Sequence, residues 1–243
     1  MLIMNSNFSE KKMRDIYNDG KYLDSNPSWH MEDSVWKASN ILKILKNNKL
    51  KPSSVVEVGC GAGEVLRNLA VKMSDIKCLD GYDISEDAYS LAKTKETEKI
   101  KFYNKDLMEA DSKKYELLMA IDVFEHIEDN FTFLRNMGTK AEYKIFHIPL
   151  DLSVQSLLRM KPILETRKSV GHIHYYTKEL ALALLEDTGY EILDYFYTSG
   201  SLELPNRGWK ANLLKFPRKI LFALSPDLAA RILGGFSLMV LAK

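Results

Sequence analysis

Residues 55–64 read Val-Val-Glu-Val-Gly-Cys-Gly-Ala-Gly-Glu, and this stretch decides the fold. An apolar run typical of a buried strand ends in a turn with three alternating glycines, and a helical pattern follows it. Glycine permits positive φ angles and a close approach of a ligand to the backbone, and the first turn of a helix offers unpaired N–H groups. The stretch therefore predicts a nucleotide-like cofactor at a strand-to-helix turn.

The spacing of the glycines argues against two common nucleotide sites. A dinucleotide-binding turn, G-x-G-x-x-G, would place its third glycine at position 64, where this chain has Glu64. A carboxylate in the first helical turn would repel a pyrophosphate at the place where the helix dipole should attract it. No Gly-Lys-Ser/Thr follows the turn, as a phosphate-binding loop would require. We therefore expect a cofactor that lacks a pyrophosphate.

Short strand-like runs alternate with amphipathic segments from Ser53 onward, which is typical of repeated strand–helix units. Strands are expected at 54–58, 77–82, 100–103, 117–121, 143–148, 191–197 and 236–241, and helices at 64–73, 85–95, 130–139 and 177–189. The sequence thus predicts an α/β fold with a doubly wound, Rossmann-like, mostly parallel sheet of seven strands.

The length of 243 residues predicts one domain with attachments, and 46% hydrophobic with 28% charged residues is ordinary for a globular protein. We expect an N-terminal helical cap (1–50), a cofactor-binding core (51–198), a helical insert (199–235) and a last strand (236–243). Cys60 and Cys78 are expected to be free thiols. No signal peptide and no apolar run of about 20 residues is found, which predicts a cytoplasmic protein without a transmembrane segment.

The glycine turn opens a series of motifs that resembles class I S-adenosylmethionine-dependent methyltransferases. Its form is E-x-G-x-G-x-G, with Glu57, Gly59, Gly61 and Gly63. The resemblance covers residues 50 to about 200 and implies S-adenosylmethionine as the cofactor. Relatives fold their N-terminal segment over the cofactor, and this segment here contains Tyr22, Trp29, Trp36 and Lys37.

Three later segments complete the cofactor site that the resemblance implies. Asp83 and Ile84 end the second strand, where an acid is expected to accept hydrogen bonds from both ribose hydroxyls. Asp106 and Leu107 follow the third strand and resemble the segment that contacts adenine. Asp122 ends the fourth strand, at the start of Asp-Val-Phe-Glu-His-Ile, which is similar to the family's next motif.

Methyl transfer is an in-line displacement, and a hydroxyl acceptor of high pKa also needs a base. His126 is the first candidate, because it follows the fourth strand at the edge where doubly wound folds bind ligands. Glu125 is its neighbour in the predicted catalytic group. His172 is the second candidate, since its loop precedes a helix and can reach over the pocket. We expect His147 and His174 to be structural.

A divalent metal ion is the alternative use of the same groups. Carboxylates with imidazole suit ions such as Mg²⁺ or Mn²⁺. The candidate ligands are Asp122, Glu125, His126 and His172, and the pattern resembles the acid-x-x-Glu-His metal site of ubiquinone-pathway O-methyltransferases and small-RNA 3′-end methyltransferases. The short Asp122 side chain at the first position disfavours the ion, so the base is preferred.

The predicted activity is O-methylation of a small polar acceptor, such as a sugar, a nucleotide-linked intermediate or a phosphoryl group in polysaccharide biosynthesis. A basic cluster of Arg159, Lys161, Arg167 and Lys168 predicts a phosphate-binding acceptor site. RNA methylation is an alternative that the net charge of +1 disfavours, and so no nucleic-acid partner is expected. A non-catalytic scaffold would be expected to have damaged cofactor motifs, which are intact here.

The 199–235 insert could form a lid over the site, the face of a homodimer or a membrane-surface helix. Its apolar residues alternate with Lys215, Arg218 and Lys219. Pro217 interrupts that pattern, which favours the lid or the dimer face over the membrane-surface helix.

Overall fold

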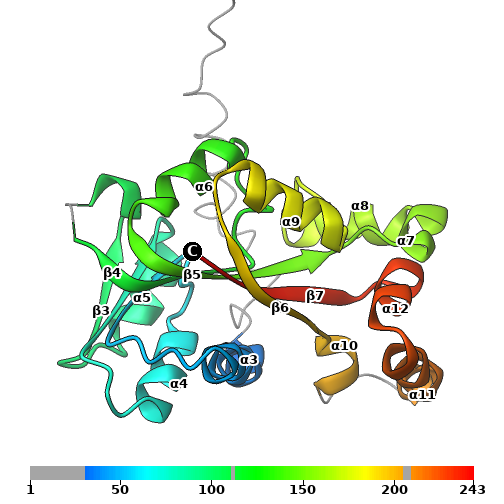
Figure 1. Ribbon diagram of the computed structural model, residues 1–243, viewed down its shortest axis with the longest axis horizontal. Helices are drawn as coiled ribbons and strands as arrows, with labels where there is room; N and C mark the ends of the chain where they lie inside the picture. Colours follow the sequence, from blue (N-terminus) through cyan, green and yellow to red (C-terminus); the bar gives the residue numbers. More distant parts are fainter. Residues whose placement is uncertain (1–30, 111–112, 205–208) are drawn as a thin grey trace, which may run out of the picture.

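The computed structural model describes residues 31–110, 113–204 and 209–243 (Figure 1). Seven strands form one sheet, in the order β3-β2-β1-β4-β5-β7-β6. The strands are β1 (Ser54–Val58), β2 (Cys78–Asp83), β3 (Ile100–Asn104), β4 (Tyr115–Ile121), β5 (Ala141–Leu150), β6 (Ile192–Thr198) and β7 (Phe236–Ala242). β7 runs antiparallel to β5 and β6, whereas β1 to β5 pair in parallel. The predicted α/β fold with a mostly parallel seven-stranded sheet is confirmed.

Helices cover both faces of the sheet, as a doubly wound fold requires (Figure 1). On one face lie α3 (Ser34–Asn47), α4 (Glu64–Lys72) and α5 (Glu86–Lys93), and on the other lie α6 (Asn130–Gly138) and α9 (Lys178–Asp187). Each face has its own buried cluster: Ile41, Leu66 and Leu69 pack on one side, and Leu134 and Leu185 on the other. A strand order that reverses beside β1 leaves a crevice at the carboxyl ends of β1 and β4.

The described part of the predicted N-terminal cap consists of a 3₁₀ turn, η1 (Met31–Asp33), and α3. Tyr22 and Trp29 lie outside the described residues. The insert between β6 and β7 contains α10 (Gly200–Glu203), α11 (Trp209–Leu224) and α12 (Pro226–Leu233). α11 continues through Pro217. The division of the chain into one domain with these attachments stays a prediction.

Two helices were not predicted, α7 (Val154–Arg159) and α8 (Lys161–Ser169). Both are short, and most of their side chains are exposed, so no apolar periodicity toward a core marks them. The local signal for α7 is Ser153, whose hydroxyl accepts from the Ser156 backbone N–H in a capping box. In the described residues, no helix is both long and apolar enough to cross a membrane.

Candidate active site

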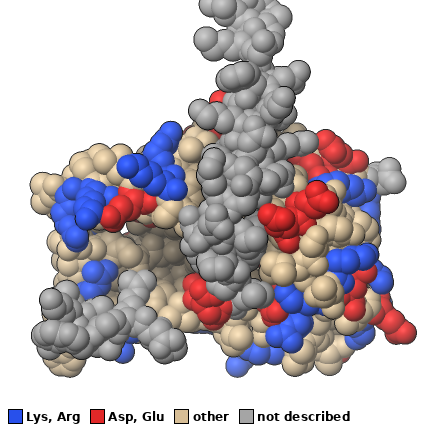
Figure 2. Space-filling model, turned by 180° about the vertical axis from the view of Figure 1, so that it is seen from behind, with Lys and Arg blue, Asp and Glu red and all other residues tan. Residues whose placement is uncertain are grey.

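A cavity of about 1020 Å³ lies at the carboxyl ends of the central strands. It is lined by residues from the glycine turn, the ends of β2, β4 and β5, the α3 helix and the start of β7. Figure 2 shows a hollow on this side of the molecule. The residues predicted to bind the cofactor that line the cavity are Glu57, Gly59, Gly61, Asp83, Ile84, Asp106, Leu107 and Asp122. Gly63 is not among the lining residues.

The glycine turn connects β1 to α4 with three residues of positive φ, 66° at Gly59, 52° at Gly61 and 77° at Gly63. Only glycine adopts this conformation without strain. At Gly63, the N-cap of α4, a Cβ atom would also lie 2.4 Å from Cζ of Phe102. Gly63 therefore lies on the side of the turn that faces β3, where there is no room for a side chain.

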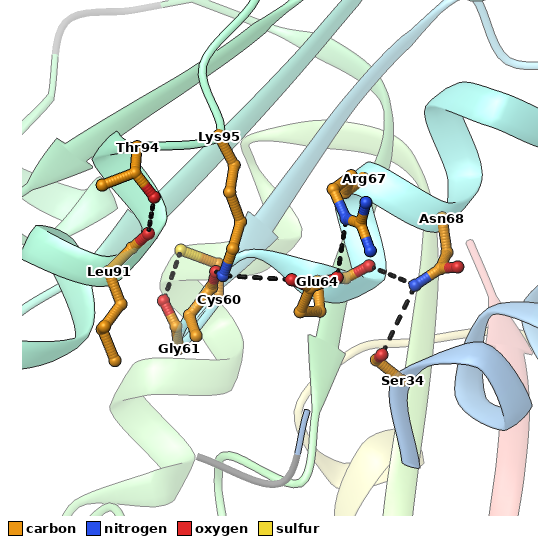
Figure 3. Close-up of polar contacts among 10 residues, drawn as sticks. Ser34, Cys60, Gly61, Glu64, Arg67, Asn68, Leu91, Thr94 and Lys95 are labelled. Carbon is orange, nitrogen blue, oxygen red and sulfur yellow. Dashed lines mark hydrogen bonds and ion pairs between the residues drawn. The ribbon is translucent and has the colours of Figure 1, made fainter. Parts of the chain in front are cut away.

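Lys95, just after α5, stabilises the turn from outside (Figure 3). Its ammonium group donates to the Ala62 carbonyl at 2.6 Å and lies 3.1 Å from a carboxylate oxygen of Glu64. Arg67 pairs with the other oxygen of Glu64 at 2.7 Å (Figure 3). Sequence analysis missed these cations, and the repulsion of a pyrophosphate by Glu64 is weaker than expected because its charge is balanced. No motif spacing indicates Lys95, since its contact depends on how α5 ends.

Asp83 is held at the mouth of the turn by two backbone N–H groups. Its carboxylate accepts from Gly61 at 2.8 Å and from Ser85 at 2.9 Å. The Ile84 backbone also contributes a hydrogen bond. A carboxylate has about four lone-pair sites, so Asp83 keeps acceptor capacity for a hydroxyl donor. Burial raises the pKa of Asp83, and the backbone hydrogen bonds oppose that rise. The group is thus fixed in place and has acceptor capacity left, as a ribose-binding acid requires.

Glu57 is almost completely buried, and its Oε2 atom has no hydrogen-bond partner in the described part of the chain. Burial raises its pKa to about 8, although the charge of Lys37 acts in the opposite direction. Asp106 accepts from the Met108 N–H at 2.8 Å and begins a 3₁₀ turn, η2 (Leu107–Glu109). A buried acceptor without a donor, beside a glycine turn and a fixed carboxylate, fits an amine- and ribose-bearing cofactor.

Asp122 has an unusual backbone, with a φ of 56°, and its carboxylate contacts a lysine and a histidine. Lys37 of α3 lies 2.8 Å from one carboxylate oxygen, and His147 Nδ1 lies 2.6 Å from the other. Burial acts to raise the pKa of Asp122, but the charges of His147 and Lys37 hold it well below its usual range. His147 Nε2 lies 2.8 Å from the Thr198 hydroxyl, so this histidine positions Asp122. Sequence analysis assigned His147 only a structural role.

The structure brings Glu125, His126 and His172 together, with candidate ligand atoms within 4.8 Å of one another. Oε1 of Glu125 lies 3.9 Å from Nε2 of each histidine. The Glu125 carbonyl accepts from the backbone N–H groups of Ile173 and His174 at 3.0 Å, which fixes the 171–175 loop beside the turn after β4. Asp122 is not part of this group, and its carboxylate contacts Lys37 and His147 instead.

The two candidate bases differ in their surroundings. Burial and the neighbouring His172 lower the pKa of His126 to about 4. His172 Nδ1 lies 2.6 Å from a carboxylate oxygen of Asp151. A carboxylate at Nδ1 fixes the tautomer that carries its proton there and leaves a lone pair on Nε2. Sequence analysis missed Asp151 as a partner, since nothing in the local pattern indicates that it faces the loop 21 residues later.

The basic cluster that sequence analysis assigned to an acceptor phosphate does not line the cavity. Arg159, Lys161, Arg167 and Lys168 are exposed on α7 and α8. The lining contains Lys37 and Lys105 against nine acids: Asp33, Glu57, Glu64, Asp83, Asp106, Asp122, Glu128, Asp129 and Asp151. Burial keeps Glu57 protonated, and Glu64 and Asp122 are paired with cations, so six acids remain against Lys105. Such a surface disfavours a phosphorylated molecule.

The raised pKa of Glu57 should make the stability of the protein depend on pH. A group with a folded pKa near 8 and an ordinary value near 4.5 keeps its proton only in the folded protein between these pH values. Stability should therefore fall as pH rises from about 4.5 to about 8. We expect Glu57→Gln to raise the Tm at pH 8 by several degrees and flatten this decline. Scanning calorimetry checks it, with the exposed Glu98→Gln as control; an unchanged decline in Glu57→Gln would contradict a neutral Glu57.

Comparisons with known proteins agree with this geometry. The family described as "Methyltransferase domain" matches residues 29–195. A ubiquinone biosynthesis O-methyltransferase of Rickettsia bellii is 20% identical over 148 residues, which are 60% of this chain and 62% of that protein. The chain thus spans less than two thirds of this relative's length.

Solved structures share the fold over nearly the whole chain. Magnesium protoporphyrin IX methyltransferase from Synechocystis PCC 6803, with bound S-adenosylhomocysteine, has a TM-score of 0.58 at 18% identity, covering 97% of this chain and 94% of that one. The N-methyltransferase NodS from Bradyrhizobium japonicum WM9, also with S-adenosylhomocysteine, has a TM-score of 0.56 at 16% identity and covers 96% of both chains. The chain belongs to the methyltransferase domain family, the class I methyltransferases that use S-adenosylmethionine as methyl donor.

Proposed function

We propose that this protein is an S-adenosylmethionine-dependent O-methyltransferase of a small polar hydroxyl acceptor. The observation that carries the proposal is the His172–Asp151 pair at 2.6 Å, in which both residues line the cavity. A hydroxyl must lose its proton as it is methylated, and an imidazole fixed at Nδ1 can take that proton at Nε2. Asp151 is then a positioning residue, and His172 replaces His126 as the first candidate for the base.

The cofactor supplies an electrophilic methyl group on a sulfonium, and the residues of the glycine-turn half of the cavity would hold it. Asp83 would accept from the ribose hydroxyls, Glu57 would accept from a donor group of the cofactor, and Asp106 with Leu107 would contact the adenine. The acid-rich lining supports a cationic donor. What the chain itself contributes is orientation of the two reactants and exclusion of water.

The acceptor half of the cavity lies between His172 and the insert, where Val170, Leu204 and Phe236 form part of the lining. A sugar or another hydroxyl compound of polysaccharide biosynthesis stays the predicted acceptor, and the acidic lining supports one without a phosphate. The same lining counts against RNA. One protein of similar structure is a magnesium protoporphyrin IX methyltransferase, and its acceptor is very different from a sugar. The fold alone therefore does not identify the acceptor. Two free cysteines, Cys60 and Cys78, support a cytoplasmic location.

The proposal is tested by incubating the purified protein and methyl-labelled S-adenosylmethionine with a panel of acceptors. The panel contains matched pairs of hydroxyl and amine compounds, each with and without a phosphate. We expect label in a neutral hydroxyl compound, and a rate lower by two to four orders of magnitude in the same reaction with His172→Ala. Transfer to amines alone, undiminished in His172→Ala, would contradict an O-methyltransferase with this base.

A metal-dependent mechanism for the same reaction is supported by a single observation. Both carboxylate oxygens of Glu125 are buried and have no hydrogen-bond partner among the described residues. One carboxylate with two imidazoles is a donor set that divalent ions accept, so Glu125, His126 and His172 fit such an ion. A bound ion would supply a Lewis acid that lowers the pKa of an acceptor hydroxyl.

We expect dialysis against EDTA to leave turnover unchanged, because Asp122, the fourth predicted ligand, is not among the residues that come together with Glu125. Methyl transfer is measured before and after dialysis, and again after addition of Mg²⁺, Mn²⁺ or Zn²⁺. If EDTA abolishes turnover and one ion restores it, Glu125, His126 and His172 are metal ligands. Binding of S-adenosylhomocysteine should be the same in all samples.

A further inference from the structure

Four helices that the catalytic proposal does not use form one end of the molecule. α12 packs against both α7 and α11, and α7 packs against α8. Figure 1 places all four together, beyond the carboxyl end of β5. We call helices α7, α8, α11 and α12 the four-helix end. It contains the basic cluster that does not line the cavity.

The four-helix end exposes apolar side chains in rows along its helices. Phe216, Ile220 and Leu224 follow one another at intervals of four on α11, and Phe216 and Leu224 are 72% and 78% exposed. On α7, Leu158 is 82% exposed next to Leu157. Further members of these rows are Val154, Met160, Leu164, Leu228 and Ile232. More than half of the large exposed hydrophobic side chains in the described residues lie here, whereas an amphipathic helix normally turns its apolar row to the core.

The same end is strongly basic. α7 and α8 contain four basic residues, all exposed, and one acid, Glu165. On α11, Lys219 adds an exposed cation, whereas Lys215 and Arg218 are half-buried and donate to the carbonyls of Leu204 and Gly234. The net charge of the whole chain is only +1, so the remainder of the molecule is acidic. Figure 2 shows Lys and Arg side chains gathered over the α7 and α8 side of the molecule, above the hollow.

These two properties together select the occupant of the surface. A second copy of the chain would bring equal basic patches face to face, which costs several kcal/mol in like-charge repulsion. Single-stranded nucleic acid needs aromatic rings for stacking, and Phe216 is the one aromatic in these exposed rows. An anionic bilayer satisfies both properties, because apolar side chains enter the acyl boundary while Lys and Arg meet the lipid phosphates.

We propose that the four-helix end is a docking surface for an anionic lipid bilayer. The protein lies on the bilayer and does not cross it. The objection that Pro217 interrupts the apolar pattern does not hold, because α11 continues through Pro217 and its apolar row extends past that residue. This docking is independent of the reaction proposed above, since none of the apolar or basic residues named here lines the cavity.

The test is sedimentation of the full chain with two kinds of vesicle, phosphatidylcholine alone and phosphatidylcholine mixed with phosphatidylglycerol. We expect binding to the anionic vesicles only, weakening as salt is added. Arg167→Gln with Lys168→Gln should weaken binding by about tenfold or more. Leu158→Gln with Phe216→Gln should weaken it to a similar degree, because both remove apolar contacts at the acyl boundary.

Matched controls separate this surface from general effects. Val71→Gln removes an apolar side chain that is also 82% exposed, on α4, and Lys99→Gln with Lys101→Gln removes two charges beside β3. Both should bind vesicles as the wild type does. Wild-type protein that stays in the supernatant with anionic vesicles would overturn the proposal, as would equal losses in the controls. A dimer in solution that Leu158→Gln dissociates would assign the surface to self-association instead.

Calorimetry with S-adenosylhomocysteine shows whether each variant is folded. Binding of this molecule should be equal in the wild type and in all surface variants. If the wild type binds anionic vesicles but not S-adenosylhomocysteine, the proposed function fails and the docking surface stands.

Discussion

Replacing His172 by alanine is expected to reduce turnover by two to four orders of magnitude, the usual contribution of a positioned general base. Asp151 accepts at 2.6 Å from one side of the ring, so Nε2 is the atom left to take the proton from the acceptor hydroxyl. Loss of the ring removes that group without touching the glycine-turn half of the cavity. The measurement is formation of S-adenosylhomocysteine with a saturating acceptor, beside calorimetric binding of the same molecule, which should change little.

Two further variants tell a base from a structural residue or a metal ligand. Asp151→Asn should lower kcat and leave the KM for the donor unchanged, because it disturbs only the orientation of the imidazole. His126→Ala should cost roughly tenfold or less, since a histidine with a pKa of about 4 is a weak base. If His126→Ala and His172→Ala lose turnover equally, and EDTA also abolishes turnover, the reaction depends on a metal ion and His172 is not the general base. Full activity in His172→Ala would contradict both.

Asp83→Ala is expected to weaken binding of S-adenosylhomocysteine by roughly ten- to a hundredfold. A charge-assisted hydrogen bond contributes about 1.5–3 kcal/mol, and the variant also frees the N–H groups of Gly61 and Ser85 that shape the turn. Asp83→Asn serves as the matched variant, because it keeps the size of the side chain and one acceptor. It should lose less than Asp83→Ala. Unchanged binding in Asp83→Ala would contradict its assignment to the ribose.

The sequence predicted the sheet well because buried parallel strands are continuous apolar runs between turn residues. All seven strands appear within two residues of their expected ends, and the carboxyl ends of β1, β2 and β4 then place Glu57, Asp83 and Asp122 on one edge. The motifs carried the cofactor assignment for the same reason, because each follows directly from a strand end. α7 and α8 were missed because their apolar residues face outward and so give no core-facing pattern.

The parts of the site that sequence could not supply depend on contacts between distant segments. Lys95 contacts the glycine turn, Lys37 and His147 contact Asp122, and Asp151 orients His172, over separations of 21 to 85 residues along the chain. No local pattern encodes these pairings. The basic cluster of α7 and α8 was misassigned to the acceptor for the opposite reason. Its composition was visible in the sequence, but which way it faces was not.

Cofactor binding by the wild-type protein shows whether the cavity accepts S-adenosylmethionine or a dinucleotide. Isothermal titration is carried out with S-adenosylhomocysteine and, in parallel, with NAD, whose binding turn would have a third glycine at position 64, where this chain has Glu64. We expect saturable binding of one S-adenosylhomocysteine per chain and no heat of binding from NAD. Binding of NAD, or the absence of any binding by S-adenosylhomocysteine to the folded protein, would contradict it.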